Sequence, residues 1–195
     1  MKGRIIGICG GIGSGKSVVS RVLRLRGEMV YDCDFEARRI MDSSPEVMMA
    51  LYERYGEEVC PAAGPICRPE LSKRVFGNRE ERLWLNAMVH RMVREDVREW
   101  ADAVFSAGGD RCFVESAILA SSGLADMCSD IILVDAPEPL RVARVGDRDG
   151  IAPEDIRRRI ESQREETRLA MDSGCRIVSV CNDNNTSILE SLGNH

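Results

Sequence analysis

Short apolar runs alternate with segments of helical periodicity along this chain. Five of the runs predict buried strands, at residues 5–9, 29–32, 111–116, 130–135 and 176–180. The first run, a helix and the second run follow one another with short connections. Such a βαβ unit requires a right-handed crossover between parallel strands. The pattern therefore predicts one α/β domain, a five-stranded parallel sheet flanked by helices, and a short helix after the last strand.

A helical block interrupts this alternation between residues 45 and 109. It predicts short helices over 45–55 and 69–76, a loop rich in proline and glycine between them, and a long helix from Asn78, its cap, to Ser106. On the long helix a stripe of apolar residues recurs at steps of three and four, which is typical of core: Val89, Val93, Val97, Trp100 and Val104. Because the block is too long for a plain crossover, we expect a helical insert that walls a substrate pocket.

A second helical segment, residues 138–171, follows the fourth strand. Gly150 and Pro153 divide it into one helix with several arginines and a second helix that we expect to reach Met171. Arg144 and Arg148 share one side of the first helix and flank the glycine, as a mobile lid for a phosphoryl group requires. Two pairs of opposite charges lie four residues apart on the second helix and predict a solvated face: Glu154 with Arg158, and Asp155 with Arg159. The core would then comprise 1–44, 110–137 and 172–195.

Composition indicates an ordinary soluble globular protein of 195 residues, 44% hydrophobic and 30% charged, with a net charge of −5. No apolar run approaches the roughly 18 residues of a membrane span, and the first strand leaves no room for a signal peptide, so we expect a cytoplasmic protein. The 27 basic residues include only three lysines and are interleaved with acids, which argues against a nucleic-acid partner. The eight cysteines form no C-x-x-C pair, so neither a disulfide scaffold nor a zinc site is expected.

The segment after the first strand carries the strongest chemical signal. It reads GGIGSGKS from Gly10 to Ser17 and satisfies the pattern G-x-x-x-x-G-K-[ST] between a strand and a helix, which we expect to end before Gly27. Its glycines allow several main-chain N–H groups to turn toward an anion, and the helix N-terminus adds partial positive charge. Lys16 would reach the β- and γ-phosphates, and the Ser17 hydroxyl would bind Mg²⁺. The predicted phosphate-binding residues are Gly11, Ile12, Gly13, Ser14, Gly15, Lys16 and Ser17.

Polar residues follow the other strands at the edge where ligands of parallel sheets bind. Asp32 and Asp34 follow the second strand; Asp34 either accepts a proton from an attacking hydroxyl or caps a helix that begins at Phe35, and Asp32 has a catalytic or metal-related role or none. Glu115 either belongs to the Mg²⁺ shell through water or simply ends its strand. Asn182 either binds a base or shapes a turn.

Taken together, these motifs resemble dephospho-coenzyme A kinases over nearly the whole chain. The resemblance rests on the phosphate loop and on further matching positions: Asp32, Asp34, Ala37, Arg38, Arg68, Leu71, Phe76, Leu85, Asn86, His90, Arg144, Arg148, Gln163 and Asn182. It implies transfer of the ATP γ-phosphoryl to the ribose 3′-hydroxyl of dephospho-CoA, with Mg²⁺. Asp34 is then the general base, Lys16 and Arg144 assist catalysis, and Arg144, Arg148 and Asn182 are nucleotide contacts.

For the acceptor, the resemblance implies binding by Asp32, Asp34, Arg68, His90 and Glu115. A hydrogen-bonded structural role remains an alternative for His90, which lies beside the apolar stripe. Three residues depart from the family pattern: Arg91 replaces a proline, Ser121 an acid and Arg141 a glutamine. None of them belongs to the phosphoryl-transfer core.

Two other functions share some of these features. Another small-molecule or nucleotide kinase would have the same loop, sheet and lid. A nucleotide-dependent switch is disfavoured because no lysine forms the Asn-Lys-x-Asp motif that reads guanine. We expect a monomer or a weak homo-oligomer.

Overall fold

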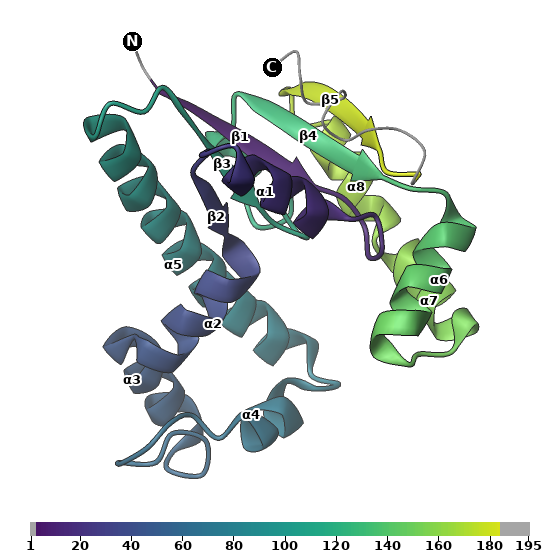
Figure 1. The fold of residues 1–195 in the computed structure, drawn as a ribbon. Helices are drawn as coiled ribbons and strands as arrows, with labels where there is room; N and C mark the ends of the chain where they lie inside the picture. The colour runs from purple at the N-terminus through teal and green to yellow at the C-terminus, as the bar shows by residue number, and fades with distance from the viewer. Residues whose placement is uncertain (1–2, 184–195) are drawn as a thin grey trace. The chain divides into compact units, whose positions relative to one another are not determined.

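The computed structural model describes residues 3–183, and the helix expected after the last strand lies outside the described residues. Five strands form one parallel sheet, as predicted, and their order is β2-β3-β1-β4-β5 (Figure 1). They are β1 (Arg4–Cys9), β2 (Val30–Asp32), β3 (Arg111–Glu115), β4 (Asp130–Asp135) and β5 (Arg176–Cys181). The chain divides into a helical unit, residues 33–99, and a sheet unit made of the described residues on either side.

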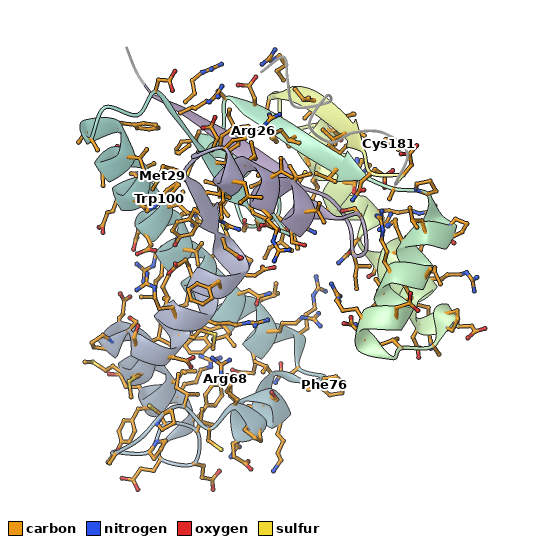
Figure 2. All side chains as sticks on the ribbon, viewed as in Figure 1. Arg26, Met29, Arg68, Phe76, Trp100 and Cys181 are labelled. Atoms are coloured by element: carbon orange, nitrogen blue, oxygen red, sulfur yellow. The ribbon has the colours of Figure 1, made fainter. Side chains whose placement is uncertain are left out.

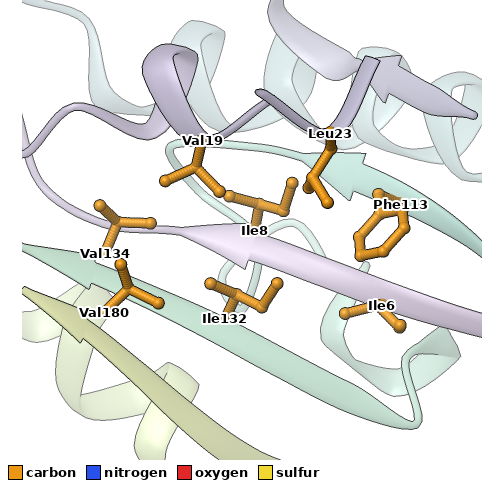
Figure 3. Packing of buried hydrophobic residues seen from close by; sticks show 8 residues of the cluster. All are labelled: Ile6, Ile8, Val19, Leu23, Phe113, Ile132, Val134 and Val180. Atoms are coloured by element: carbon orange, nitrogen blue, oxygen red, sulfur yellow. The ribbon is translucent and has the colours of Figure 1, made fainter. Parts of the chain in front are cut away.

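Helix α1 (Lys16–Leu25) covers one face of the sheet because its apolar residues recur on one side. Val19 and Leu23 are buried and face Ile6, Ile8 and Phe113 of the central strands (Figure 3). Full burial of one such side chain contributes about 1.5–3 kcal/mol. This packing fixes the start of α1, and with it the phosphate loop, to the end of β1.

The connection from β3 to β4 packs beneath the opposite side of β1. Leu119 and Leu124 are buried in it, and a 3₁₀ turn spans Ala125–Met127. A Cβ atom at Gly7 would lie 2.5 Å from Leu119 Cδ2. Glycine in the middle of β1 therefore allows this close approach.

The helical unit contains α2 (Cys33–Ser43), α3 (Pro45–Tyr55), α4 (Arg68–Val75) and most of α5 (Arg79–Ser106), which continues into the sheet unit. Asn78 caps α5 as predicted, since its Oδ1 accepts from the N–H groups of Glu80 and Glu81 at 3.1 and 3.3 Å. The predicted apolar stripe on α5 is buried at Val89, Val93 and Val97 and half-buried at Trp100 and Val104.

Three helices lie between β4 and β5: α6 (Glu138–Asp149), α7 (Pro153–Ser162) and α8 (Arg164–Met171). The prediction of one helix from Pro153 to Met171 is wrong, because the chain turns at Gln163 (φ −94°, ψ −3°). The predicted charge pairs also differ. Arg158 pairs with Asp155 one turn before it, and Arg157 lies 3.7 Å from Glu138 on α6. These two arginines of α7 thus pair with an acid three residues earlier in the chain and with an acid on another helix.

Candidate functional site

The main-chain carbonyl oxygens of the phosphate loop, residues 10–17, accept hydrogen bonds from the protein itself. Lys16 Nζ donates to the Gly10 carbonyl (2.5 Å), and the Ser14 N–H donates to that of Gly11 (3.1 Å). The carbonyls of residues 12, 13 and 14 accept from side chains of α6 and of the segment after β5. Five successive carbonyls are thus held by the protein. This orientation suits a loop whose N–H groups receive an anion.

Gly10 and Gly15 of this loop cannot gain a side chain without displacing a neighbour. Gly10 has φ +151°, and a Cβ atom there would lie 2.1 Å from the Val134 carbonyl oxygen. Gly15 has φ +95°, and its Cβ would lie 2.0 Å from Asn182 Nδ2. Gly15 also precedes the first residue of α1, where the helix dipole favours negative charge. The conformation of this loop therefore depends on glycine at both positions.

Arg144 and Asn182 both donate hydrogen bonds to main-chain carbonyls of this loop. Arg144 Nη1 donates to the Gly13 carbonyl (3.2 Å), and Nη2 donates to the carbonyl and the Oδ1 of Asn182 (3.0 and 3.2 Å). Asn182 Nδ2 in turn donates to the Ser14 carbonyl (3.0 Å), and its side chain is buried. Two residues predicted as nucleotide contacts thus lie together beside the loop. Arg148, the third, is exposed and pairs with Asp149.

Two side chains that the sequence did not assign to the loop contact Ile12. Arg141 Nε donates to the Ile12 carbonyl (2.9 Å), and Gln163 Oε1 accepts from the Ile12 N–H (2.6 Å). Burial lowers the pKa of Arg141, and the nearby Asp135 carboxylate opposes that shift. In the sequence, Arg141 stood out only because it differs from the family pattern. Gln163 matches that pattern, but the match assigned no role to it.

Asp32 and Glu115 lie opposite each other in the register of β2 and β3, at the strand ends. Burial raises the pKa of Glu115, and the charge of Asp32 raises it further, while Lys16 and Arg24 lower it. Among the described residues no cluster of three His, Cys, Asp or Glu side chains could hold a metal. The Ser17 hydroxyl is exposed, and Asp32 and Glu115 offer carboxylate oxygens, so the chemistry of these side chains fits Mg²⁺ held mainly by phosphate and water.

Glu166 of α8 is a further residue that the sequence did not reveal. Its carboxylate accepts from the N–H groups of Ala120 (2.6 Å) and Ser121 (3.2 Å) in the segment after β3. Ser121 occupies the position where the family pattern has an acid. In this chain the Glu166 carboxylate of α8 accepts from the Ser121 N–H. Burial, with the charge of Glu166, raises the pKa of the Cys9 thiol to about 12.

A cavity of about 560 Å³ lies at the carboxyl edge of the sheet unit, beside α6, α7 and α8. Both polar and apolar residues line it: Gly11, Leu133, Val134, Asp135, Ala136, Pro137, Glu138, Arg141, Ile160, Arg164, Thr167, Met171 and Cys181. Cys181 ends β5 (Figure 2). The eight cysteines, all of which lie in the described part of the chain, are present as free thiols.

The remaining predicted residues belong to the helical unit. Helix α2 begins at Cys33, so Asp34 lies exposed in its first turn, and the alternative that it caps a helix beginning at Phe35 is wrong. Arg68 opens α4 and pairs with Asp42 of α2 at 2.6 Å (Figure 2). His90 is half-buried on α5, next to the buried Val89. Arg91, the departure beside it, pairs with Glu46 and Glu95.

Comparison with known proteins identifies a kinase family. A sequence profile described as dephospho-CoA kinase matches residues 4–188. The dephospho-CoA kinase of Porphyromonas gingivalis is 42% identical over 165 residues, covering 85% of this chain and 80% of that protein. The dephospho-CoA kinase of Corynebacterium diphtheriae is 34% identical over 191 residues, covering 97% and 93%.

Solved structures agree with the fold. A protein of Thermus thermophilus matches with a TM-score of 0.75 and 30% identity, covering 99% of this chain and 94% of the other. A dephospho-CoA kinase of Campylobacter jejuni matches with a TM-score of 0.67 at 20% identity, covering 96% and 92%. At 12% identity, a shikimate kinase of Acinetobacter baumannii shares the fold alone, with a TM-score of 0.50. The chain therefore belongs to the dephospho-CoA kinase family.

Proposed function

We propose that this protein transfers the γ-phosphoryl group of ATP to the ribose 3′-hydroxyl of dephospho-CoA, which yields coenzyme A and ADP. The observation that carries the proposal is the phosphate loop, in which carbonyls 10–14 are all bonded to the protein's own donors. Such a loop presents N–H groups to a polyphosphate. The family match supplies the acceptor.

In this proposal the sheet unit binds and orients ATP. Lys16 leaves the Gly10 carbonyl to contact the β- and γ-phosphates, and Arg144 and Asn182 contact the nucleotide beside the loop. Mg²⁺, when bound through Ser17 and water near Asp32 and Glu115, would neutralise phosphate charge. Because phosphoryl transfer needs little covalent chemistry from the protein, positioning and electrostatics provide most of the acceleration.

The acceptor side of the proposal rests on the helical unit. Asp34 takes the proton of the attacking 3′-hydroxyl, and Arg68 and His90 contact dephospho-CoA. An exposed carboxylate in the first turn of α2 is accessible to such a hydroxyl. We assign residues 45–109 to acceptor binding and 138–171 to a lid that carries Arg148 toward the transferred group and excludes water.

Further parts of the proposal concern the protein's setting. No helix in the described part of the chain is long and apolar enough to cross a membrane. We propose a cytoplasmic enzyme that acts as a monomer or weak homo-oligomer and binds no nucleic acid.

A coupled ADP-release assay with ATP and Mg²⁺ tests the proposal. Dephospho-CoA should stimulate ADP release, whereas nucleosides and nucleoside monophosphates should not. Stimulation by a nucleoside or nucleotide instead would favour another kinase of the same fold, and acceptor-independent GTP hydrolysis would favour a switch.

The general base is tested with Asp34→Asn. This variant should bind ATP normally and lose at least about a hundredfold in kcat, the lower end of what general-base catalysis contributes. Glu36→Gln is a matched control, because it removes a carboxylate from the same turn of α2 and breaks only the Arg39 pair that the structure records. Near-normal turnover of Asp34→Asn would remove Asp34 from this role.

A further inference from the structure

Both main-chain polar groups of Ile12 are bonded to side chains from the segment that follows β4. The Ile12 N–H donates to Gln163 Oε1 (2.6 Å), and its carbonyl accepts from Arg141 Nε (2.9 Å). Ile12 lies between Gly11 and Gly13, so its neighbours impose little conformational restriction. These two contacts, together with the bond from the Ser14 N–H to the Gly11 carbonyl, hold the Ile12 peptide groups in their direction.

The two side chains also fill the space beside the loop. A Cβ atom at Gly11 would lie 2.2 Å from Arg141 Nη2 and 3.3 Å from Gln163 Oε1. The Arg141 side chain is only 13% exposed. Its charged partner, Asp135, is 3.4 Å away and 71% exposed, so that ion pair is weak. The bond to Ile12 is thus the shortest polar contact recorded for this guanidinium in the described structure.

Gln163 reaches the loop because of the break between α7 and α8. Its side chain is half-buried, and its N–H donates to the Ile160 carbonyl at 3.2 Å, as in a tightened last turn. The chain turns at Gln163, and this turn directs the side-chain amide toward Ile12. A continuous helix would not fix that direction. Three residues later, Glu166 holds Ala120 and Ser121. The start of α8 and the residue before it are therefore bonded at two places, to the phosphate loop and to the segment after β3.

We propose that Gln163 and Arg141 are positioning residues for the nucleotide: together they hold the Ile12 peptide groups and so keep the phosphate loop in its anion-binding form. This inference rests on the proposed ATP binding. Neither residue needs to touch the phosphates, because they act through Ile12. Without Gln163 and Arg141, ATP binding would also have to order the phosphate loop, and this cost would lower the affinity for ATP.

Isothermal titration of the full-length protein with ATP and Mg²⁺, without acceptor, tests the proposal. In Gln163→Met, which keeps the length of the side chain but removes the acceptor, the Kd for ATP should rise about tenfold, as expected from the loss of one hydrogen bond. The amide of Ile12 should also exchange faster with solvent, as measured by NMR. In the kinetic assay the KM for ATP should rise, while the KM for dephospho-CoA should change less than twofold.

Glu165→Gln is the matched control, since this neighbour on α8 is exposed and pairs with Arg168; its Kd should stay within twofold. A cooperatively folded Gln163→Met protein with wild-type affinity for ATP would overturn the proposal. If Gln163→Met does not fold, Arg141→Met is measured, and unchanged affinity in that variant overturns the proposal equally. A wild-type protein that binds ATP but does not phosphorylate dephospho-CoA would refute the proposed function and leave this test intact.

Discussion

Replacing Gly15 with alanine should damage the nucleotide site by two separable effects. The residue has φ +95°, a conformation that costs an alanine about 1–2 kcal/mol. Its Cβ would also lie 2.0 Å from Asn182 Nδ2, which donates to the Ser14 carbonyl. Because Asn182 is buried, losing that bond adds about 1–3 kcal/mol. The expected loss of unfolding free energy is about 2–5 kcal/mol.

Gly108 provides a matched control for the first effect. It has φ +96°, and a Cβ atom there would meet nothing within 4 Å. Gly108→Ala should therefore lose only the backbone contribution of about 1–2 kcal/mol and bind ATP as the wild type does. In Gly15→Ala, displacement of Asn182 should weaken ATP binding at least about tenfold, which corresponds to 1.4 kcal/mol.

Urea denaturation and calorimetric titration with ATP measure the two quantities on the same preparations. The reasoning is refuted if Gly15→Ala is as stable as Gly108→Ala and binds ATP with wild-type affinity. That result would mean that Asn182 can move away without changing the loop.

Three further predictions concern stability and reactivity. Leu51→Ala, at a fully buried position in α3, should lower the unfolding free energy by about 2–5 kcal/mol in urea denaturation, and a loss under 1 kcal/mol would contradict the packing. Burial raises the pKa of Glu115 above its ordinary value of 4.5, so the folded state binds this proton more tightly than the unfolded state. Glu115→Gln should therefore match the wild type at low pH and become the more stable protein as pH rises above about 4.5, measured without nucleotide and Mg²⁺; a constant difference would contradict this. Iodoacetamide at neutral pH should modify the exposed Cys181 well before the buried Cys9, whose pKa is raised to about 12, and peptide mass spectrometry showing the reverse order would contradict the burial.

The sheet and the phosphate loop could be predicted from sequence because their signals are local. Strand periodicity, the loop spacing and the glycines each depend on adjacent residues. The cap at Asn78 and the stripe through Val97 were predictable for the same reason.

Contacts between distant residues could not be predicted. Gln163 and Ile12 are 151 positions apart, and nothing in either residue type marks the other as its partner. The break at Gln163 has no proline or glycine of its own, so periodicity favoured one long helix. Leu119 in the segment after β3 is buried because Gly7 leaves room for it, which only the packed structure reveals.

The most direct test of the central claim is identification of the product formed from ATP and dephospho-CoA by the purified protein. One ADP should form for each new phosphoester, with the phosphate on the ribose 3′-oxygen, as shown by chromatography against coenzyme A and by phosphorus NMR. Release of inorganic phosphate with dephospho-CoA unchanged, or a phosphoester at another hydroxyl, would rule out the proposed transfer.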